Sequence, residues 1–204
     1  MVAARRPGEK HKSPATVHPP ARSPRPPPAM PSSPPEARQR NLDAFSAALL
    51  EQAYDRLSTV ALLRRAGVGR TTFYAQFRDK EDLLAISARG MGEHMAQAAL
   101  AEAGPCGFLR PFLRHVDSHR RIYSGFVGRE SAPVLERHMQ RLFARWLADD
   151  LVRRGRPVPD ALREAALVGV LWAMLVAWIE RRIQLGHEAR ALQAAGMLDA
   201  LASR

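Results

Sequence analysis

Apolar side chains recur every three or four residues through most of the chain beyond residue 36, which is the spacing of one face of an α-helix. No stretch alternates apolar and polar residues as a half-buried strand would. The pattern therefore predicts an all-α protein. We expect two short helices within residues 57–80, and longer helices at about 36–54, 79–103, 108–126, 134–147, 160–183 and 188–202.

The stretch at 160–183 is the most apolar part of the chain, with no charged residue between Ala165 and Ile179. Such a run is shorter than the roughly 20 apolar residues that cross a bilayer, so we expect a core helix buried on all sides. A chain of this size has few places to bury such a helix, which suggests that a partner subunit covers part of it. The last helix has a face that permits close approach, formed by Ala191, Ala195, Leu198 and Leu201.

Residues 57–80 have the pattern of helix, tight turn and helix. Ser58 or Thr59 can cap the first helix, and Gly67 can take the left-handed conformation that ends it. Val68 is expected to be buried in the corner, and Gly69 to open the second helix. The inward face of the first helix is expected to consist of Val60, Leu62 and Leu63.

The second helix of this segment has two contrasting sides. Phe73 and Phe77, four residues apart, are expected to anchor it. The other side offers groups that suit the base edges and phosphates of a DNA major groove: Arg70, Thr71, Thr72, Tyr74 and Gln76. Residues 57–80 also carry five basic side chains and one acidic one, whereas a solvated helical hairpin usually mixes its charges. The pattern predicts a DNA-reading helix-turn-helix.

The motif Ala66-Gly67-Val68, followed by Thr72-Phe73-Tyr74 and by FRDKEDLL at 77–84, resembles the TetR family of bacterial transcriptional regulators. In that family the residues matching Tyr74 and Lys80 touch the DNA backbone. We therefore expect contacts at or near the bases from Arg70, Thr72 and Gln76, with Thr71 beside them, and phosphate contacts from Thr59, Tyr74 and Lys80. Three residues depart from the family pattern without removing a DNA-facing group: Ala53, Leu63 and Gly69.

The composition predicts a tail at 1–36, and the resemblance implies a DNA-binding domain at 37–82 and a helical ligand-binding and dimerisation domain at 83–204. It implies a cytoplasmic homodimer paired through helices 160–184 and 188–202, and a repressor released from a palindromic operator by a small, apolar ligand. No cofactor, metal, membrane or catalytic activity is expected. The alternatives are a ligand-independent DNA-binding or partner-recruiting protein, and a helical enzyme or binding protein with a vestigial DNA-binding head.

The helical body is rich in aromatic residues and methionine, which could either line a cavity between helices or fill a solid core. The resemblance favours a cavity. The candidate lining residues are Met91, Met95, Phe112, His115, Tyr123, Phe126, Met139, Phe143 and Trp172, with Trp146 and Met174 as further candidates.

The net charge of +11 favours acidic partners, nucleic acid first among them. Residues 1–40 hold eight basic and two acidic side chains, so they supply +6 of this charge. Eleven of the sixteen prolines lie in residues 1–36, which predicts a disordered segment with polyproline stretches. This tail could be an inert extension with Met30 as the true start, a basic arm on DNA phosphates, or a ligand for a proline-binding partner. It lacks the apolar core of a secretion signal.

Signals for catalysis are weak. The single Cys106 excludes an internal disulfide and is expected to be an apolar filler. The chain has no glycine-rich phosphate loop, nucleophile elbow or His-Glu-x-x-His motif. His115 and His119 have a spacing that a metal site can use, but no third ligand is evident, so an ordinary histidine pair is expected.

Overall fold

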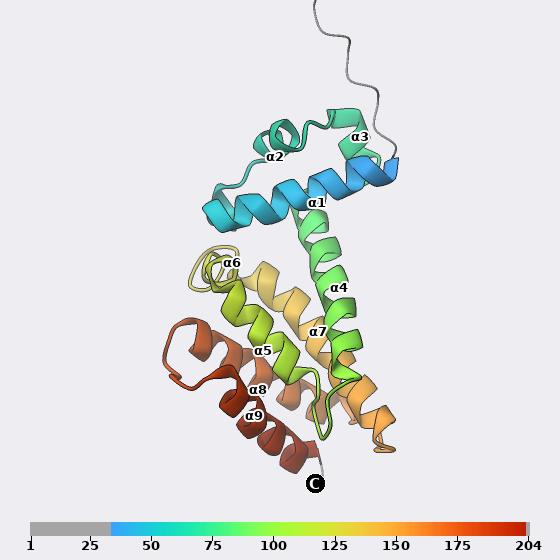
Figure 1. Cartoon of the computed structure of the whole chain (residues 1–204), viewed down its shortest axis with the longest axis vertical. Helices are drawn as coiled ribbons and strands as arrows, with labels where there is room; N and C mark the ends of the chain where they lie inside the picture. The colour runs from blue at the N-terminus through green and yellow to red at the C-terminus, as the bar shows by residue number, and fades with distance from the viewer. Residues whose placement is uncertain (1–33, 203–204) are drawn as a thin grey trace, which may run out of the picture. The chain divides into compact units, whose positions relative to one another are not determined.

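The computed structural model describes residues 34–202, and these are helical without any strand, which confirms the all-α class. A 3-10 helix at Tyr54–Arg56 lies between the first two α-helices. Figure 1 shows the α-helices before α4 (Lys80–Ala99) grouped at one end of it, and α5 (Leu109–Ser118) and α7 (Ala132–Arg153) packed against it in the body. The predicted tail up to residue 33 lies outside the described residues. The helices are α1 (Pro34–Glu51), α2 (Thr59–Ala66), α3 (Arg70–Tyr74), α4 (Lys80–Ala99), α5 (Leu109–Ser118), α6 (Arg120–Ser124), α7 (Ala132–Arg153), α8 (Ala161–Ile179) and α9 (His187–Ala202).

The first helix begins two residues earlier than expected and is shorter at its other end. Proline is tolerated at the start of α1 because the first N–H groups of a helix make no bond within it. The prediction that Tyr54 continues this helix is wrong, because α1 ends at Glu51. Tyr54 instead lies in the 3-10 helix, where its buried ring meets Phe45 edge-on with the ring centroids 6.4 Å apart.

Helix α4 begins as predicted after Asp79, whose side chain accepts a hydrogen bond from the N–H of Asp82 at 2.8 Å. It ends at Ala99, four residues before the expected end at Ala103. The following turns include Gly104 and Cys106, both with positive φ. Since α4 packs against α1 as well as against α5 and α7, it connects the α1–α3 group to the body.

The helix expected at 108–126 is two helices, α5 and α6, that meet at His119. His119 has φ −116° and ψ 23°, which breaks the α-helical course. Its ring Nδ1 lies 3.0 Å from the His115 carbonyl oxygen, so the side chain competes with the backbone for that acceptor. After this break Tyr123 and Phe126 both turn inward and are buried.

The residues predicted to line a ligand pocket come together as a packed core. Rings of Phe112, Phe143 and Trp146 lie 5.3–6.0 Å apart, in tilted and edge-on arrangements that leave little space between them. Six of the nine main candidates are buried: Met95, Phe112, Tyr123, Phe126, Met139 and Phe143. The other three are half-buried: Met91, His115 and Trp172. Of the two alternatives that the sequence allowed, a cavity or a solid core, these residues therefore form a solid core.

The apolar helix α8 is covered on one side only. Its buried residues are Leu167, Val168, Leu171, Leu175, Trp178 and Ile179. The opposite side is exposed, and Leu162 keeps 83% of its surface accessible. Burial on all sides is therefore wrong for the single subunit, because no described helix covers this face.

By length and hydropathy, α8 is also the one described helix that could cross a membrane, with a mean hydropathy of 1.7 over its most apolar window. A core helix of a soluble protein meets the same criterion when it is buried, and one third of this window is buried in the subunit.

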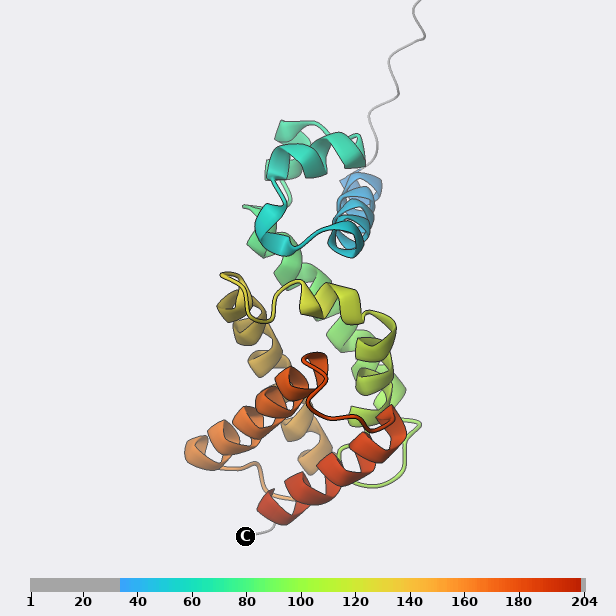
Figure 2. The same cartoon turned by 90° about the vertical axis from the view of Figure 1, so that its left-hand side faces the viewer.

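Most of the α9 face that was predicted to permit close approach of another helix is buried within the subunit. Ala191, Ala195 and Leu198 are buried, where α9 packs on α5 and α8, and only Leu201 of the four is exposed. Figure 2 shows α8 and α9 side by side at the end of the chain. The face of α9 that remains available includes Leu192, which is 74% exposed.

A buried carboxylate organises the turn after α4. Asp150 is 2% exposed and accepts a hydrogen bond from the Cys106 backbone N–H at 3.0 Å. Its two carboxylate oxygens also pair with Arg153 Nη2 at 2.5 Å and with Arg154 Nη1 at 3.3 Å. Arg154 forms a second ion pair, with Asp199 on α9. Burial raises the pKa of the Cys106 thiol to about 12, which fits an inert packing residue.

We predict that Asp150→Asn lowers the free energy of unfolding by about 2–4 kcal/mol, because it leaves buried donors without their charged acceptor. The control is Asp149→Asn, since Asp149 is exposed and lies 3.8 Å from Arg145. It should change stability by less than about 0.5 kcal/mol. Urea denaturation followed by circular dichroism measures both, and equal effects would show that Asp150 is not an organising group.

Candidate nucleic-acid interface

The turn between α2 and α3 is closed by the residues that the sequence marked for it. Ser58, rather than Thr59, caps α2, since its side chain accepts a hydrogen bond from the Ala61 N–H at 3.2 Å. Gly67 has φ 63° and ends α2 in the left-handed region, as predicted. The next N–H, of Val68, reaches back to the Leu63 carbonyl at 3.2 Å, and the Val68 side chain is buried.

Helix α3 is short and is held by its two phenylalanines. Phe73 and Phe77 are 0% and 1% exposed, and their ring centroids are 5.2 Å apart. Phe77 lies beyond the last helical residue, Tyr74, so the anchor spans the helix and the turn after it. This confirms the predicted anchoring and leaves the rest of α3 free to face outward.

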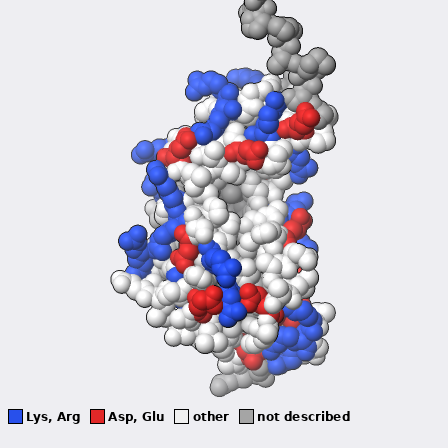
Figure 3. Space-filling view, in the orientation of Figure 1, with Lys and Arg blue, Asp and Glu red and all other residues white. Residues whose placement is uncertain are grey.

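The outward side of α3 carries four of the predicted DNA-contacting residues. Arg70, Thr71, Thr72 and Tyr74 are all exposed, with Tyr74 keeping 57% of its surface accessible. Figure 3 shows Lys and Arg side chains around this end of the molecule. A guanidinium, two hydroxyls and a phenol on one exposed helix can donate hydrogen bonds to base edges and phosphates. Thr59 lies half-buried at the first position of α2.

Two residues of the motif point differently from what the sequence suggested. Val60 was expected to face inward with Leu62 and Leu63, but it is 57% exposed, while the other two are buried. Gln76 was placed with the base-reading residues. It lies past the end of α3, is half-buried, and donates from Nε2 to the Pro34 carbonyl at 3.1 Å. In this structure Gln76 holds the start of α1.

Lys80, predicted as a phosphate contact, is engaged within the chain. Its Nζ donates to the backbone carbonyls of Tyr54 at 3.1 Å and Leu57 at 3.2 Å. The same ammonium lies 4.4 Å from the centroid of the Tyr54 ring, which is a cation–π distance. Lys80 thus ties the start of α4 to the end of the 3-10 helix.

Sequence reasoning missed the ion pair that joins α1 to α2. Arg65 donates to both carboxylate oxygens of Glu51, at 2.6 and 2.7 Å. The hydrogen bond from Arg65 holds the pKa of the Glu51 carboxyl below its usual value. The two residues lie fourteen positions apart, so no local spacing could have revealed the pair.

Residues on either side of the helix-turn-helix contact the body. The Tyr54 ring stacks on Phe126, with centroids 4.9 Å apart, and Phe126 is fully buried. Glu81 in the first turn of α4 pairs with Arg137 of α7 at 2.7 Å. A change in the body at α6 or α7 therefore reaches residues that position α1 and α4.

The histidine pair forms no recognisable metal site. The rings of His115 and His119 stack with centroids 4.2 Å apart. Burial, with smaller effects from His119 and His94, lowers the pKa of His115 to about 4, so it is neutral near pH 7. Among residues 34–202, no three His, Cys, Asp or Glu side chains group as metal ligands would.

Comparison with known proteins supports the DNA-binding interpretation. Residues 42–85 match the family model described as bacterial regulatory proteins, tetR family, a span that contains α2, α3 and the turn between them. No match was found among curated proteins.

Several solved structures share the fold at low identity. A TetR transcriptional regulator from Streptococcus agalactiae 2603V has TM-score 0.60 and 19% identity, covering 81% of this chain and 94% of its own. A TetR transcriptional regulator from Rhodococcus sp. RHA1 has TM-score 0.60 and 19% identity, with coverage of 81% and 97%. NalD of Pseudomonas aeruginosa, the secondary repressor of the MexAB-OprM multidrug efflux pump, has TM-score 0.53 and 19% identity, with coverage of 82% and 97%.

We predict that Lys80→Met lowers the free energy of unfolding by about 1–3 kcal/mol, because two carbonyls lose a charged donor. The dependence of DNA affinity on salt should stay unchanged, since the ammonium is already bound within the chain. Urea denaturation and DNA titrations at several salt concentrations measure the two effects. A fall of about one unit in the salt slope would instead place Lys80 on a phosphate, as the sequence alone suggested.

Proposed function

Because the chain is a DNA-binding transcriptional regulator with the helix-turn-helix of the TetR family, we propose that it acts in the cytoplasm as a homodimeric repressor released from its operator by a small ligand. The observation that carries the proposal is the exposed polar face of α3, which buried Phe73 and Phe77 hold in place. A face with these donors, on a rigid base, suits a major groove.

Two copies would place their α3 helices in successive major grooves. The two reading helices then lie about 34 Å apart, or a multiple of this, along a palindromic site. Arg70 and Thr72 are our candidates for base contact, with Thr71 beside them, while Thr59 and Tyr74 are our candidates for contact with the DNA phosphates. Gln76 reaches a base only if its bond to Pro34 opens.

The exposed side of α8 supports the dimer. Small residues recur along it with helical spacing, which lets a second helix approach closely: Ala165, Ala166, Gly169 and Ala173. Leu162 on α8 and Leu192 on α9 add large apolar surface beside this stripe. An apolar helix exposed to water is unfavourable, so pairing α8 and α9 with their copies would remove this surface from solvent.

The contacts between head and body give a route for release. A ligand that changes the position of α6 or α7 would act on Tyr54 through Phe126, and on α4 through the Glu81–Arg137 pair. Its effect on DNA binding is limited to its difference in affinity for the two states. The packed aromatic core favours one alternative, a regulator that needs no ligand.

A titration of the purified protein, followed by fluorescence anisotropy, tests the proposal. The duplex just upstream of its own gene is compared with a scrambled duplex at two salt concentrations. We expect the upstream site to be preferred by about 10³-fold or more. Repeating the titration without residues 1–33 separates binding by the head from binding by the basic segment. If no genomic duplex is preferred in a selection from fragmented DNA, the regulator is not sequence-specific.

Arg70→Ala should relax base preference and cost about 1–3 kcal/mol of binding free energy at the operator, if Arg70 makes a bidentate base contact. Scrambled DNA should lose less affinity. Arg89→Ala is the control, because Arg89 is an exposed arginine on α4, outside the reading helix. Competition titrations with single-base operator variants measure the preference, and an unchanged profile removes Arg70 from the base-reading residues.

Ala173→Glu should convert the dimer to monomer, because it would place carboxylates in the apolar interface between the two α8 helices. Operator affinity should fall by about tenfold or more with it. Ala101→Glu, at an exposed position after α4, is the control. Sedimentation velocity measures the mass, and a dimeric Ala173→Glu variant would show that α8 does not form the interface.

A further inference from the structure

An apolar cavity of about 150 Å³ lies between α5, α8 and α9, apart from the packed aromatic core. It is lined by Leu109, Leu113, Leu171, Met174, Leu175, Trp178, Ile183, Arg190, Gln193, Ala194 and Met197. Apolar cavities of about this volume hold a molecule of benzene size. Of the residues that the sequence suggested for a pocket, only Met174 belongs to this set.

The polar groups of the cavity come from one stripe of α9. Arg190 and Gln193 are three residues apart, so both project from the same side of the helix, with Met197 one turn further on. Arg190 is only 8% exposed, and its guanidinium lies 3.6 Å from the centroid of the Trp178 ring. A buried cation therefore stands at the edge of an otherwise apolar space.

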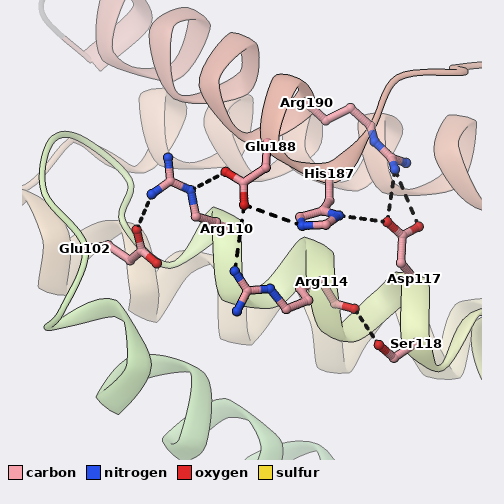
Figure 4. A network of polar contacts seen from close by, with 8 residues as sticks. All are labelled: Glu102, Arg110, Arg114, Asp117, Ser118, His187, Glu188 and Arg190. Carbon is pink, nitrogen blue, oxygen red and sulfur yellow. Dashed lines mark hydrogen bonds and ion pairs between the residues drawn. The ribbon is translucent and has the colours of Figure 1, made fainter.

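The hydrogen bonding of Arg190 is incomplete. Its Nη2 lies 3.2 and 3.4 Å from the carboxylate oxygens of Asp117, while its buried Nε has no partner among the described residues. Asp117 is shared with His187, whose Nδ1 lies 3.5 Å away, as Figure 4 shows. A guanidinium offers five N–H donors. The single long ion pair to Asp117, which also pairs with His187, therefore leaves some of the Arg190 donors without an acceptor.

The charges around Arg190 also leave room for an anion. Arg120 lies near it and donates to the carbonyls of Trp178 and Ile179, both at 2.6 Å. The Arg190 guanidinium therefore has one carboxylate, Asp117, as its ion-pair partner, and a second cation, Arg120, in its surroundings. Burial lowers the pKa of the Arg190 guanidinium, with Asp117 opposing this effect. A second carboxylate at Arg190 would offset the loss of water around it.

We propose that this cavity binds a small monocarboxylate with an apolar body about the size of benzoate, with its carboxylate on Arg190. The Arg190 N–H groups hold the anion, and the leucines, Met174 and Trp178 enclose the apolar part. Gln193 and Met197 are exposed on α9, one of the two helices proposed to pair with a second subunit. A ligand there would alter how the subunits meet, and this regulatory consequence rests on the proposed function.

Isothermal titration calorimetry on the full chain tests the site with two acids, benzoate and hexanoate, and their neutral counterparts, benzyl alcohol and hexanol. We expect each acid to bind about tenfold or more tightly than its alcohol, because a charged hydrogen bond is added. Arg190→Gln should abolish the preference. Arg114→Gln should keep it, since Arg114 is exposed in the same α5–α9 charged network and does not line the cavity.

Met174→Trp provides a second variant that leaves the charges in place and narrows the cavity, so both the acids and the alcohols should bind more weakly. Thermal unfolding of each variant shows whether it is folded. Should Arg190→Gln fail to fold, the decision rests on the acid preference of the wild type and its loss of affinity in Met174→Trp.

The site is overturned if neither acid binds, if acids and alcohols bind equally, or if a folded Arg190→Gln retains the preference. The calorimetry samples contain no DNA, so a failure of the ligand site can be distinguished from a failure of operator binding. A protein that selects its operator but binds no acid keeps the proposed function and loses this site.

Discussion

Tyr54 is the residue on which the relation between the DNA-binding helices and the body depends. Its ring lies edge-on to Phe45 of α1 and is stacked on Phe126 after α6, while its carbonyl accepts from Lys80 at the start of α4. Three elements far apart in the chain therefore meet at one side chain. Burial raises the pKa of the Tyr54 hydroxyl, so the ring stays neutral within this apolar contact.

The cations of the motif divide into two groups. Lys80 stabilises the junction and Arg65 pairs with Glu51, so neither is fully available to a phosphate. Arg70 remains on the exposed side of α3. The basic residues of this segment thus serve two purposes. Lys80 and Arg65 hold neighbouring helices together, and Arg70 lies on the exposed surface.

The body shows a comparable division of its apolar residues. The aromatic rings around Phe143 pack against one another and support α4 and α7, whereas one side of α8 is left exposed in the subunit. The small cavity lies between α5, α8 and α9, beside Arg190. The packed support for α4, the surface suited to a second subunit and the space suited to a ligand are therefore formed by different sets of residues in the body.

The helical class and the geometry of the helix-turn-helix could be predicted from local patterns in the sequence. Gly67 ends α2, Asp79 caps α4, and Phe73 with Phe77 mark the buried side of α3 through spacing alone. The long-range partners of the motif residues could not be predicted, because they depend on how the helices pack. Gln76 bonds to Pro34, 42 positions away, and Lys80 bonds to the carbonyls of Tyr54 and Leu57. The residues predicted to line a pocket pack against one another instead. Contacts at such separations depend on how whole helices pack, and helical periodicity specifies which side of a helix is apolar but not what will cover it.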